Sequence, residues 1–278
     1  NKDFTWKTKF NFSKVNNKIL ELYYNAPELY NSDTWVYANA RNGLIPGGSG
    51  GTITSFGYLR DENTGKIIID RTTGLPRLDA LYFRKRGDRT PDFTLGWQNI
   101  LTYKNITISF LWDLKVGGDI VNLTDLYLTR VGRSNRTADR LKSRVIDGIL
   151  DEGIFIDAEN KAYITNPKQN TIVITPYYQN SYYANLPEEE FIEKNINWFR
   201  LRDFTISYAL NTKKISKYIK SLNIYSTITD PILFTNYTGG DPQVSVTGAG
   251  SRGTGGWGFD YLNIGSPISI NVGIRANF

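Results

Sequence analysis

The sequence predicts an all-β fold, an antiparallel transmembrane β-barrel segment with long extracellular loops. The strongest signal is the stretch 266–278, in which apolar and polar residues alternate without interruption and the last residue is aromatic. This length matches the roughly 9–11 tilted residues that a strand needs to cross a bilayer. Its apolar side, which we expect to face lipid, comprises Ile268, Ile270, Val272, Ile274, Ala276 and Phe278.

Hydropathy agrees with a membrane protein built from strands. The mean hydropathy is −0.38, and no run approaches the roughly 20 continuous apolar residues of a membrane helix. A barrel strand turns half of its side chains toward a polar lumen, so a low average is expected.

The chain of 278 residues contains neither Cys nor His. Their absence excludes disulfides, thiolate or imidazole metal ligands, and nucleophile–base pairs built on Cys or His. Asp151 and Glu152 could imitate a glycosidase pair, but nothing places a second acid at a defined distance. We therefore expect a protein that is not an enzyme, with no catalytic residues, no metal ligands and no cofactor.

The net charge of +6 comes from Lys and Arg residues spread along the chain, with no nucleic-acid recognition motif. The glycine stretches at 47–51 and 238–258 lack the Gly-Lys-Ser/Thr ending of a phosphate-binding loop. Neither nucleic acid nor nucleotide is expected as a partner. The densest basic cluster is predicted to be a solvated turn and comprises Lys213, Lys214, Lys217 and Lys220.

Two strands are expected near the N-terminus. Residues 4–13 alternate aromatic and polar side chains, a turn follows at 15–18, and residues 20–24 alternate again. A short turn between two such runs predicts a hairpin, and both strands would contact lipid.

Two long irregular regions surround a second hairpin. Residues 26–90 are rich in Gly, Pro, Asn and Asp and predict a long loop that includes a hairpin around 63–65. Residues 93–103 and 106–116 predict strands joined by a turn at 104–105. The region 118–195 is irregular again, with a helix expected near 141–150 behind a Thr137 cap.

A third pair of strands is expected at 204–210 and 222–230, joined by the basic turn. Pro231 interrupts the second strand, which is tolerated near a bulge. Arg200 and Arg202 share the phase of Phe204, so we expect them above the hydrocarbon, at or beyond the extracellular interface. A glycine-rich loop at 238–265 then leads to the final strand.

About seven strands result, and their connections alternate between long and short. Short periplasmic turns and long extracellular loops are typical of bacterial outer-membrane barrels. An odd number of antiparallel strands does not close such a barrel. We therefore expect residues 1–278 to be the C-terminal part of one larger barrel domain.

Several segments resemble the C-terminal barrel region of SusC/RagA-type TonB-dependent transporters. They are DFTLGWQN at 92–99, GGDI at 117–120, FRLRDFTISY at 199–208 and LFTNYTGGDPQ at 233–243. The last is the most specific, because it looks like the family's order of Leu-Phe-Thr, Tyr and Gly-x-Asp-Pro-Glu. Gln243 replaces the family's Glu, and residues 229–232 depart from its Gly-Gln-Asn-like approach to this motif.

The resemblance implies a 22-stranded barrel blocked by a plug, of which the plug and the earlier strands are absent from this chain. It implies an outer-membrane importer of glycans or peptides. Its partners would be outer-membrane lipids, a SusD-like lipoprotein lid, the barrel-assembly machinery, and TonB acting through the missing N-terminal part. A barrel of the same family that serves as a docking subunit of a larger complex is the alternative. A soluble carbohydrate-binding β-domain is a third reading, which detergent dependence would test.

The strand faces and loops supply the candidate site residues. Charged residues on the polar faces would line the lumen, where they contact plug or substrate or simply form a hydrated wall: Lys7, Lys9, Asp113 and Lys115. Loop residues could stack on sugars or contact a partner, or pack locally: Tyr182, Tyr183, Asp241 and Trp257.

Two further features carry alternatives. Phe278 resembles the terminal aromatic that the barrel-assembly machinery reads, and it would also suit an interfacial aromatic girdle. The acidic run at 188–190 could hold a cation, although three adjacent carboxylates in a loop are usually solvated.

Overall fold

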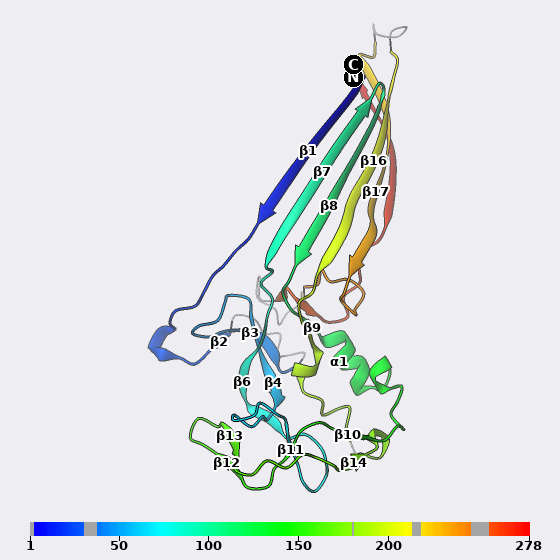
Figure 1. Cartoon of the computed structure of the whole chain (residues 1–278). Helices are drawn as coiled ribbons and strands as arrows, with labels where there is room; N and C mark the ends of the chain where they lie inside the picture. Colours follow the sequence, from blue (N-terminus) through cyan, green and yellow to red (C-terminus); the bar gives the residue numbers. More distant parts are fainter. Residues whose placement is uncertain (1–2, 31–37, 180, 213–217, 246–255) are drawn as a thin grey trace.

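The longest strands of the chain form one antiparallel sheet, here called the barrel sheet, and their long connections form a separate mass at one end, the loop body (Figure 1). The computed structural model describes residues 3–30, 38–179, 181–212, 218–245 and 256–278. No helix among these residues is long and apolar enough to cross a membrane. The predicted all-β antiparallel fold is confirmed.

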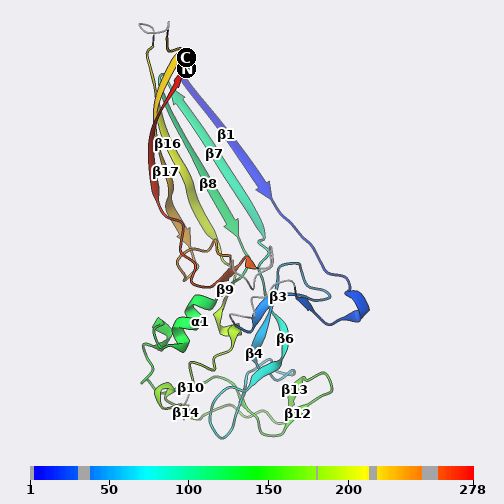
Figure 2. The ribbon, with the colours of Figure 1, turned by 180° about the vertical axis from the view of Figure 1, so that it is seen from behind.

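The barrel sheet has six strands, each paired with its neighbours in order. The turn at Lys104 and Asn105 and both chain termini lie at the end away from the loop body (Figures 1 and 2). Short and long connections are thus separated at opposite ends, as expected. The strands are β1 (Phe4–Ser13), β7 (Phe93–Tyr103), β8 (Ile106–Val116), β16 (Trp198–Leu210), β17 (Ser221–Thr235) and β19 (Ser269–Asn277).

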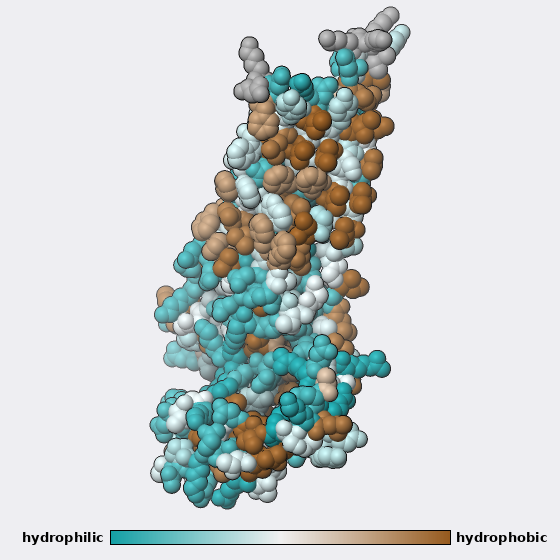
Figure 3. All heavy atoms as spheres, turned by 45° about the vertical axis from the view of Figure 1, so that its right-hand side comes forward, coloured by the Kyte–Doolittle hydropathy of each residue, from teal (hydrophilic) through white to brown (hydrophobic). Residues whose placement is uncertain are grey.

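One face of the barrel sheet is apolar and open. Directly opposed residues share a face, and the register pairs Phe10 with Trp97 and Trp97 with Trp112. The Phe10 and Trp97 rings stack at 5.9 Å between centroids. Figure 3 shows apolar side chains gathered over the strands and a mostly hydrophilic surface over the loop body. An apolar face of this extent matches a surface covered by lipid.

The other face is lined by hydroxyl groups. The Oγ1 atoms of Thr205 and Thr227 lie 2.8 Å apart across β16 and β17. On the final strand, a Cβ at Gly273 would come within 2.6 Å of the Tyr225 ring. Glycine at this position therefore lets the Tyr225 ring lie flat over the strand, where Arg275 stacks on it at 5.9 Å.

The predicted N-terminal hairpin is wrong. β1 pairs with β7 instead, and residues 20–24 form no strand but lead into a short 3-10 turn, η1 (Tyr23–Asn25). The backbone of Ile19 pairs with the loop body, since its N–H donates to the Gly48 carbonyl and its carbonyl accepts from Gly47, both at 2.8 Å. The barrel sheet therefore has one strand fewer than the seven expected.

The region 26–90 is more ordered than the expected loop. It contains a sheet in the order β2-β3-β4-β6, and β6 was missed because charged side chains occur on both of its faces. The hairpin expected around 63–65 is present, since Arg60 and Ile67 form an antiparallel bridge and Gly65 N–H donates to the Asp61 carbonyl at 2.7 Å. The strands of this sheet are β2 (Leu29–Tyr30), β3 (Ala40–Leu44), β4 (Thr52–Tyr58) and β6 (Leu78–Asp88). The region also contains β5 (Ile68–Ile69), which pairs with another segment of the loop body.

The helix expected near 141–150 is also wrong. Two pieces of that segment pair with distant strands, β10 with β14 and β11 with β5, so tertiary pairing overrides the helical spacing. The helix of this region is α1 (Leu123–Arg130), whose N-cap Asn122 accepts from Asp125 N–H at 2.8 Å. The short strands are β9 (Ile120–Asn122), β10 (Arg144–Val145), β11 (Ile149–Leu150), β12 (Ile154–Ile156), β13 (Ala162–Ile164), β14 (Val173–Ile174), β15 (Ile192–Glu193) and β18 (Phe259–Asp260).

The loop body has its own core. Residues from all three long connections meet there, including Ile53, Val121, Phe191 and Phe259, each at most 1% exposed. Since these residues lie far apart in the sequence, the core ties the three connections into one unit.

Candidate functional site

A β-bulge in β16 reverses the side on which two arginines lie. The register of β16 shifts between Leu201 and Asp203, and β17 shifts opposite it at Asp230 and Pro231. Arg200 consequently lies opposite Asp113 on the polar face and is only 2% exposed. The expectation that Arg200 and Arg202 share the phase of Phe204 is therefore wrong, because the extra residue of a bulge breaks the alternation.

These arginines form a charged cluster at the junction of strands and loops, here called the junction network. Arg202 donates two hydrogen bonds to Asp113, at 2.8 and 2.9 Å, and lies 3.6 Å from Asp230. Arg200 lies 3.4 Å from Asp230 and pairs with Asp241. The predicted residues Asp113 and Asp241, 128 positions apart in the sequence, thus belong to one network.

Asp241 attaches the last long loop to the sheet. Besides Arg200, its carboxylate accepts from the N–H groups of Gln243 at 2.9 Å and Ser266 at 3.2 Å. Burial alone would raise the pKa of Asp241, but the hydrogen bonds from Arg200 and the two N–H groups hold that pKa below its usual value. The Asp of the family-like motif is therefore a structural anchor as well as a turn residue.

The remaining predicted lumen residues share the polar face. The register places Lys7 and Lys9 of β1 and Lys115 of β8 on the side of Asp113. Within the described part of the chain, Lys7 and Lys9 form no ion pair. Only Lys115 lies close to the loop body, where it lines a cavity together with the predicted Trp257.

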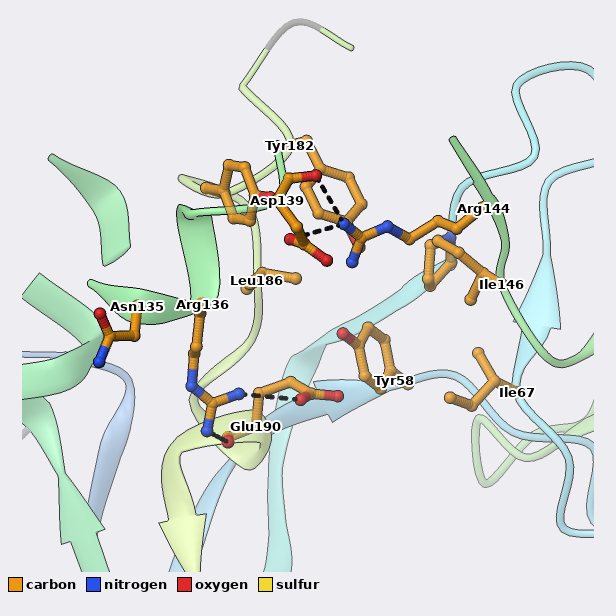
Figure 4. A pocket seen from close by; sticks show the side chains of 12 residues that line it. Tyr58, Ile67, Asn135, Arg136, Asp139, Arg144, Ile146, Tyr182, Leu186 and Glu190 are labelled. Atoms are coloured by element: carbon orange, nitrogen blue, oxygen red, sulfur yellow. Dashed lines mark hydrogen bonds and ion pairs between the residues drawn. The ribbon is translucent and has the colours of Figure 1, made fainter. Parts of the chain in front are cut away.

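Tyr182 and Tyr183 line a different hollow in the loop body, the tyrosine pocket (Figure 4). Its volume is about 360 Å³, and the two rings meet edge to face at 4.9 Å. Its charges are balanced, since Arg144 lies 2.8 Å from Asp139 and Arg136 lies 3.7 Å from Glu190.

The tyrosine pocket includes a residue that the sequence did not single out. Tyr58 of β4 is 6% exposed, and burial together with the neighbouring Glu190 raises its pKa well above the usual range. Tyr58 therefore remains a neutral hydrogen-bonding group. Apolar, aromatic and paired charged side chains together are typical of a pocket for a small polar molecule.

The three acids of the run at 188–190 each pair with an arginine rather than surrounding a metal cation. Glu188 lies 3.2 Å from Arg130, Glu189 lies 2.6 Å from Arg60, and Glu190 pairs with Arg136. Among the described residues, no group of three or more acids could hold a metal ion. The run instead ties three separate segments of the loop body together.

A buried arginine that the sequence reading missed holds the glycine stretches. Arg89 is 0% exposed and donates to the carbonyl groups of Gly51, at 3.3 Å, and Trp257. A Cβ at Gly118 or Gly258 would come within 2.7 Å of Arg89 atoms, which explains glycine at both places. Burial lowers the pKa of Arg89 to about 9, so it stays charged at neutral pH. The signal available in the sequence was the two glycine stretches at 47–51 and 238–258, which lack a phosphate-loop ending.

The structure also locates the Asp151–Glu152 pair, Phe278 and one lysine of the basic cluster. Asp151 pairs with Arg77 at 3.1 Å and Glu152 with Lys168 at 2.8 Å, so each acid has its own partner. Phe278 is 79% exposed at the end of the sheet. Lys220 donates to the Phe278 carbonyl at 2.9 Å, and the other three lysines of the basic cluster lie outside the described residues.

Comparison with known proteins gives one consistent set of relatives, although no family model matches the chain. TonB-dependent receptor P3 of Formosa agariphila is 26% identical over 300 residues, covering 100% of this chain and 27% of the relative. TonB-dependent receptor P26 of the same organism is 22% identical and covers 99% of this chain and 27% of the relative. The chain thus spans about a quarter of the length of the curated relatives it matches.

Solved structures agree in fold. The RagAB peptide importer in its "closed-closed" state matches 100% of this chain and 28% of the solved chain, with a TM-score of 0.60 and 16% identity. Its "open-open" state matches 100% and 27%, with a TM-score of 0.55 and 17% identity. The lipid-compatible outer face, the separated loops and these matches lead to one conclusion. Along its whole length the chain is similar to part of the TonB-dependent receptors of the bacterial outer membrane, and its fold matches that of the RagAB barrel.

Proposed function

We propose that this chain forms barrel wall and extracellular loops of a nutrient importer that takes up glycans or peptides. The observation that carries the proposal is the match over the whole chain to proteins named TonB-dependent receptors. The polar inner face and the hollowed loop body support it, because an importer needs a hydrated path and a site that contacts its substrate.

The rest of the receptor would supply the other functions. We propose that the remaining strands and a plug lie elsewhere in the protein, that TonB acts through that plug, and that a SusD-like lipoprotein covers the loop body. Transport would then proceed by binding and gated passage rather than by catalysis. The tyrosine pocket is an extracellular contact site in this scheme.

The test is growth of a strain that lacks the gene for the whole receptor. With glycans or peptides as the sole carbon source, the deletion strain should fail on at least one nutrient. The full-length gene should restore growth, and a strain without functional TonB should fail on the same nutrient. A SusD-like lipoprotein should co-purify with the receptor in detergent.

The docking-subunit alternative predicts a different result. Loss of the receptor would then dissociate an outer-membrane complex while growth on every nutrient stayed normal. That outcome, with several proteins co-purifying in fixed ratio, would reject the import proposal.

A further inference from the structure

A second cavity lies where β8 and β16 meet the loop body, and it is here called the cationic cavity. Its volume is about 700 Å³, larger than that of the tyrosine pocket. Lys115 and Arg202 line it from the strands, and Gln243 and Trp257 line it from the last long loop. It therefore opens on the polar face of the sheet, at the extracellular end of the barrel.

The charge of its lining distinguishes the cationic cavity from the tyrosine pocket and from a third hollow beside Lys14. Two cations and no acid occur among the described residues that line it. The tyrosine pocket has two arginines and two acids, and a third hollow, beside Lys14, contains Asp88, Asp92 and Asp119. Of these three hollows, the cationic cavity is the one whose lining would attract an anion.

Lys115 is the less neutralised of the two cations. In the described part of the chain, no carboxylate lies within 4.0 Å of it. Asp119, the acid that influences it, is already held by Lys194 Nζ at 3.0 Å and by the N–H groups of Asp88 and Asn195. A Cβ at Gly118 would come within 3.3 Å of Lys115 Nζ, so this glycine leaves room for the ammonium group.

Arg202 and the tryptophans give the cavity a rigid wall. Two hydrogen bonds to Asp113 fix the Arg202 guanidinium, which stacks over the Trp198 ring at 5.2 Å. Trp257 is held from behind by Arg89, whose guanidinium lies 4.5 Å from the ring centroid. A ligand would thus meet the Lys115 ammonium, a point charge, beside planar, preorganised groups.

We infer that the cationic cavity binds a carboxylate or sulfate group of the imported molecule, with Lys115 as the principal charge contact. The inference rests on the proposed import function and narrows it to acidic substrates. Lys115 donates to the anion, Arg202 adds positive potential, and Trp257 contacts the uncharged part of the ligand. The residue that carries recognition is therefore on the barrel wall rather than in the tyrosine pocket.

The test is calorimetric titration of the whole receptor, purified in detergent, with matched acidic and neutral probes. The probes are trigalacturonate and its methyl ester, triglutamate and triglutamine, and sodium sulfate against sodium chloride at equal ionic strength. We expect at least one acidic probe to bind tenfold or more tightly than its neutral counterpart. The probe that binds distinguishes an acidic sugar from an acidic peptide.

One variant and its matched control test whether the acidic probe binds at Lys115. Lys115→Met should weaken the acidic probe about tenfold and leave the neutral probe unchanged, because one charge-assisted hydrogen bond is lost. Lys7→Met is the matched control, since Lys7 lies on the same face but outside the cavity, and it should change neither affinity.

Three results would overturn the inference. One is equal affinity for every acidic and neutral pair, and another is an equal loss for both probes in Lys115→Met. The third is that no acidic probe binds while Lys115→Met lowers the melting temperature, which would assign Lys115 to a carboxylate within the receptor itself. Growth on the nutrient is measured separately, so a receptor that imports but binds no anion leaves the import proposal intact.

Discussion

The barrel sheet leaves Val272 74% exposed, whereas the loop body buries Phe259 completely. The sheet is held by long runs of backbone pairing, such as the pairing of β16 with both β8 and β17. The loop body is held by a small apolar core and by ion pairs between distant segments, such as Glu188 with Arg130. The sheet thus requires lipid as its solvent, and the loop body resembles a water-soluble domain.

This difference shows how one chain satisfies two environments. In the sheet, alternation of side chains decides which groups meet lipid, so the local sequence suffices. In the loop body, each charge needs a partner from another segment, so the complete fold is required. The junction network lies at the boundary between the two regions. Its residues occupy the polar face of the strands, and its charges pair between distant segments.

The largest expected effect is at that boundary. Arg200→Met should lower the free energy of unfolding by about 3–5 kcal/mol, because it leaves the buried Asp241 without its cation and leaves Asp230 with Arg202 alone. Urea-induced unfolding of the receptor in lipid vesicles measures the change. Arg275→Met is the control on the same face and should change stability by less than about 0.5 kcal/mol. Equal effects of the two variants would contradict the network.

The second effect tests the lipid face. Val272→Lys should destabilise the folded receptor by about 2–4 kcal/mol, since the charge would lie near the middle of the hydrocarbon. Asn271→Lys, one residue away on the polar face, should change stability little. The same unfolding measurement compares them. If Asn271→Lys proved the more harmful variant, the assignment of the two faces would be reversed.

A smaller effect is expected inside the loop body. Asn122→Ala should cost about 1 kcal/mol, because Asp125 N–H at the start of α1 loses its acceptor. Asn122→Ser should restore most of this stability, since Ser is a good helix cap. Hydrogen exchange at the Asp125 amide gives the local readout, and unchanged exchange in Asn122→Ala would argue against the cap.

The smallest expected effect is the loss of the stabilising contribution of Asp241 at low pH. The folded pKa of Asp241 is lowered, so its contribution to stability is complete above the ordinary value of 3.8 and is lost as pH falls through the folded pKa. The protection factors of the Gln243 and Ser266 amides, which correct the exchange rates for the intrinsic effect of pH, should therefore stay constant from pH 7 to about 4 and fall only below that pH. Asp241→Asn should remove this dependence. A loss of protection already near pH 6 would disagree with a lowered pKa for Asp241.

Most barrel strands could be predicted from the sequence, because the alternation of side chains along a strand depends only on neighbouring residues. Two-residue alternation located β1, β7, β8 and β19, and the turn at 104–105 set the register of the second hairpin. The exceptions have physical causes. The expected strand at 20–24 fails because the backbone of Ile19 pairs with Gly47 and Gly48, and the sequence phase of Arg200 fails because of the bulge.

The candidate site was predictable only in part. Lys115, Asp241 and Trp257 were recognised as residue types in suitable places, but their surroundings depend on contacts across many residues of chain. Tyr58 and Arg89 gave no signal of their own, since a single tyrosine or arginine is unremarkable until other segments enclose it.

By itself, the sequence determined which side chains meet lipid and which meet water, because a strand of period two assigns its faces without outside help. It also determined that the chain lacks the chemistry of Cys and His. Only the tertiary structure decided which arginine pairs with which carboxylate, where the bulge inverts a face, and that Lys115 lines a cavity with no acid among the described lining residues. Those outcomes depend on distances between segments that pair and pack only in the complete fold.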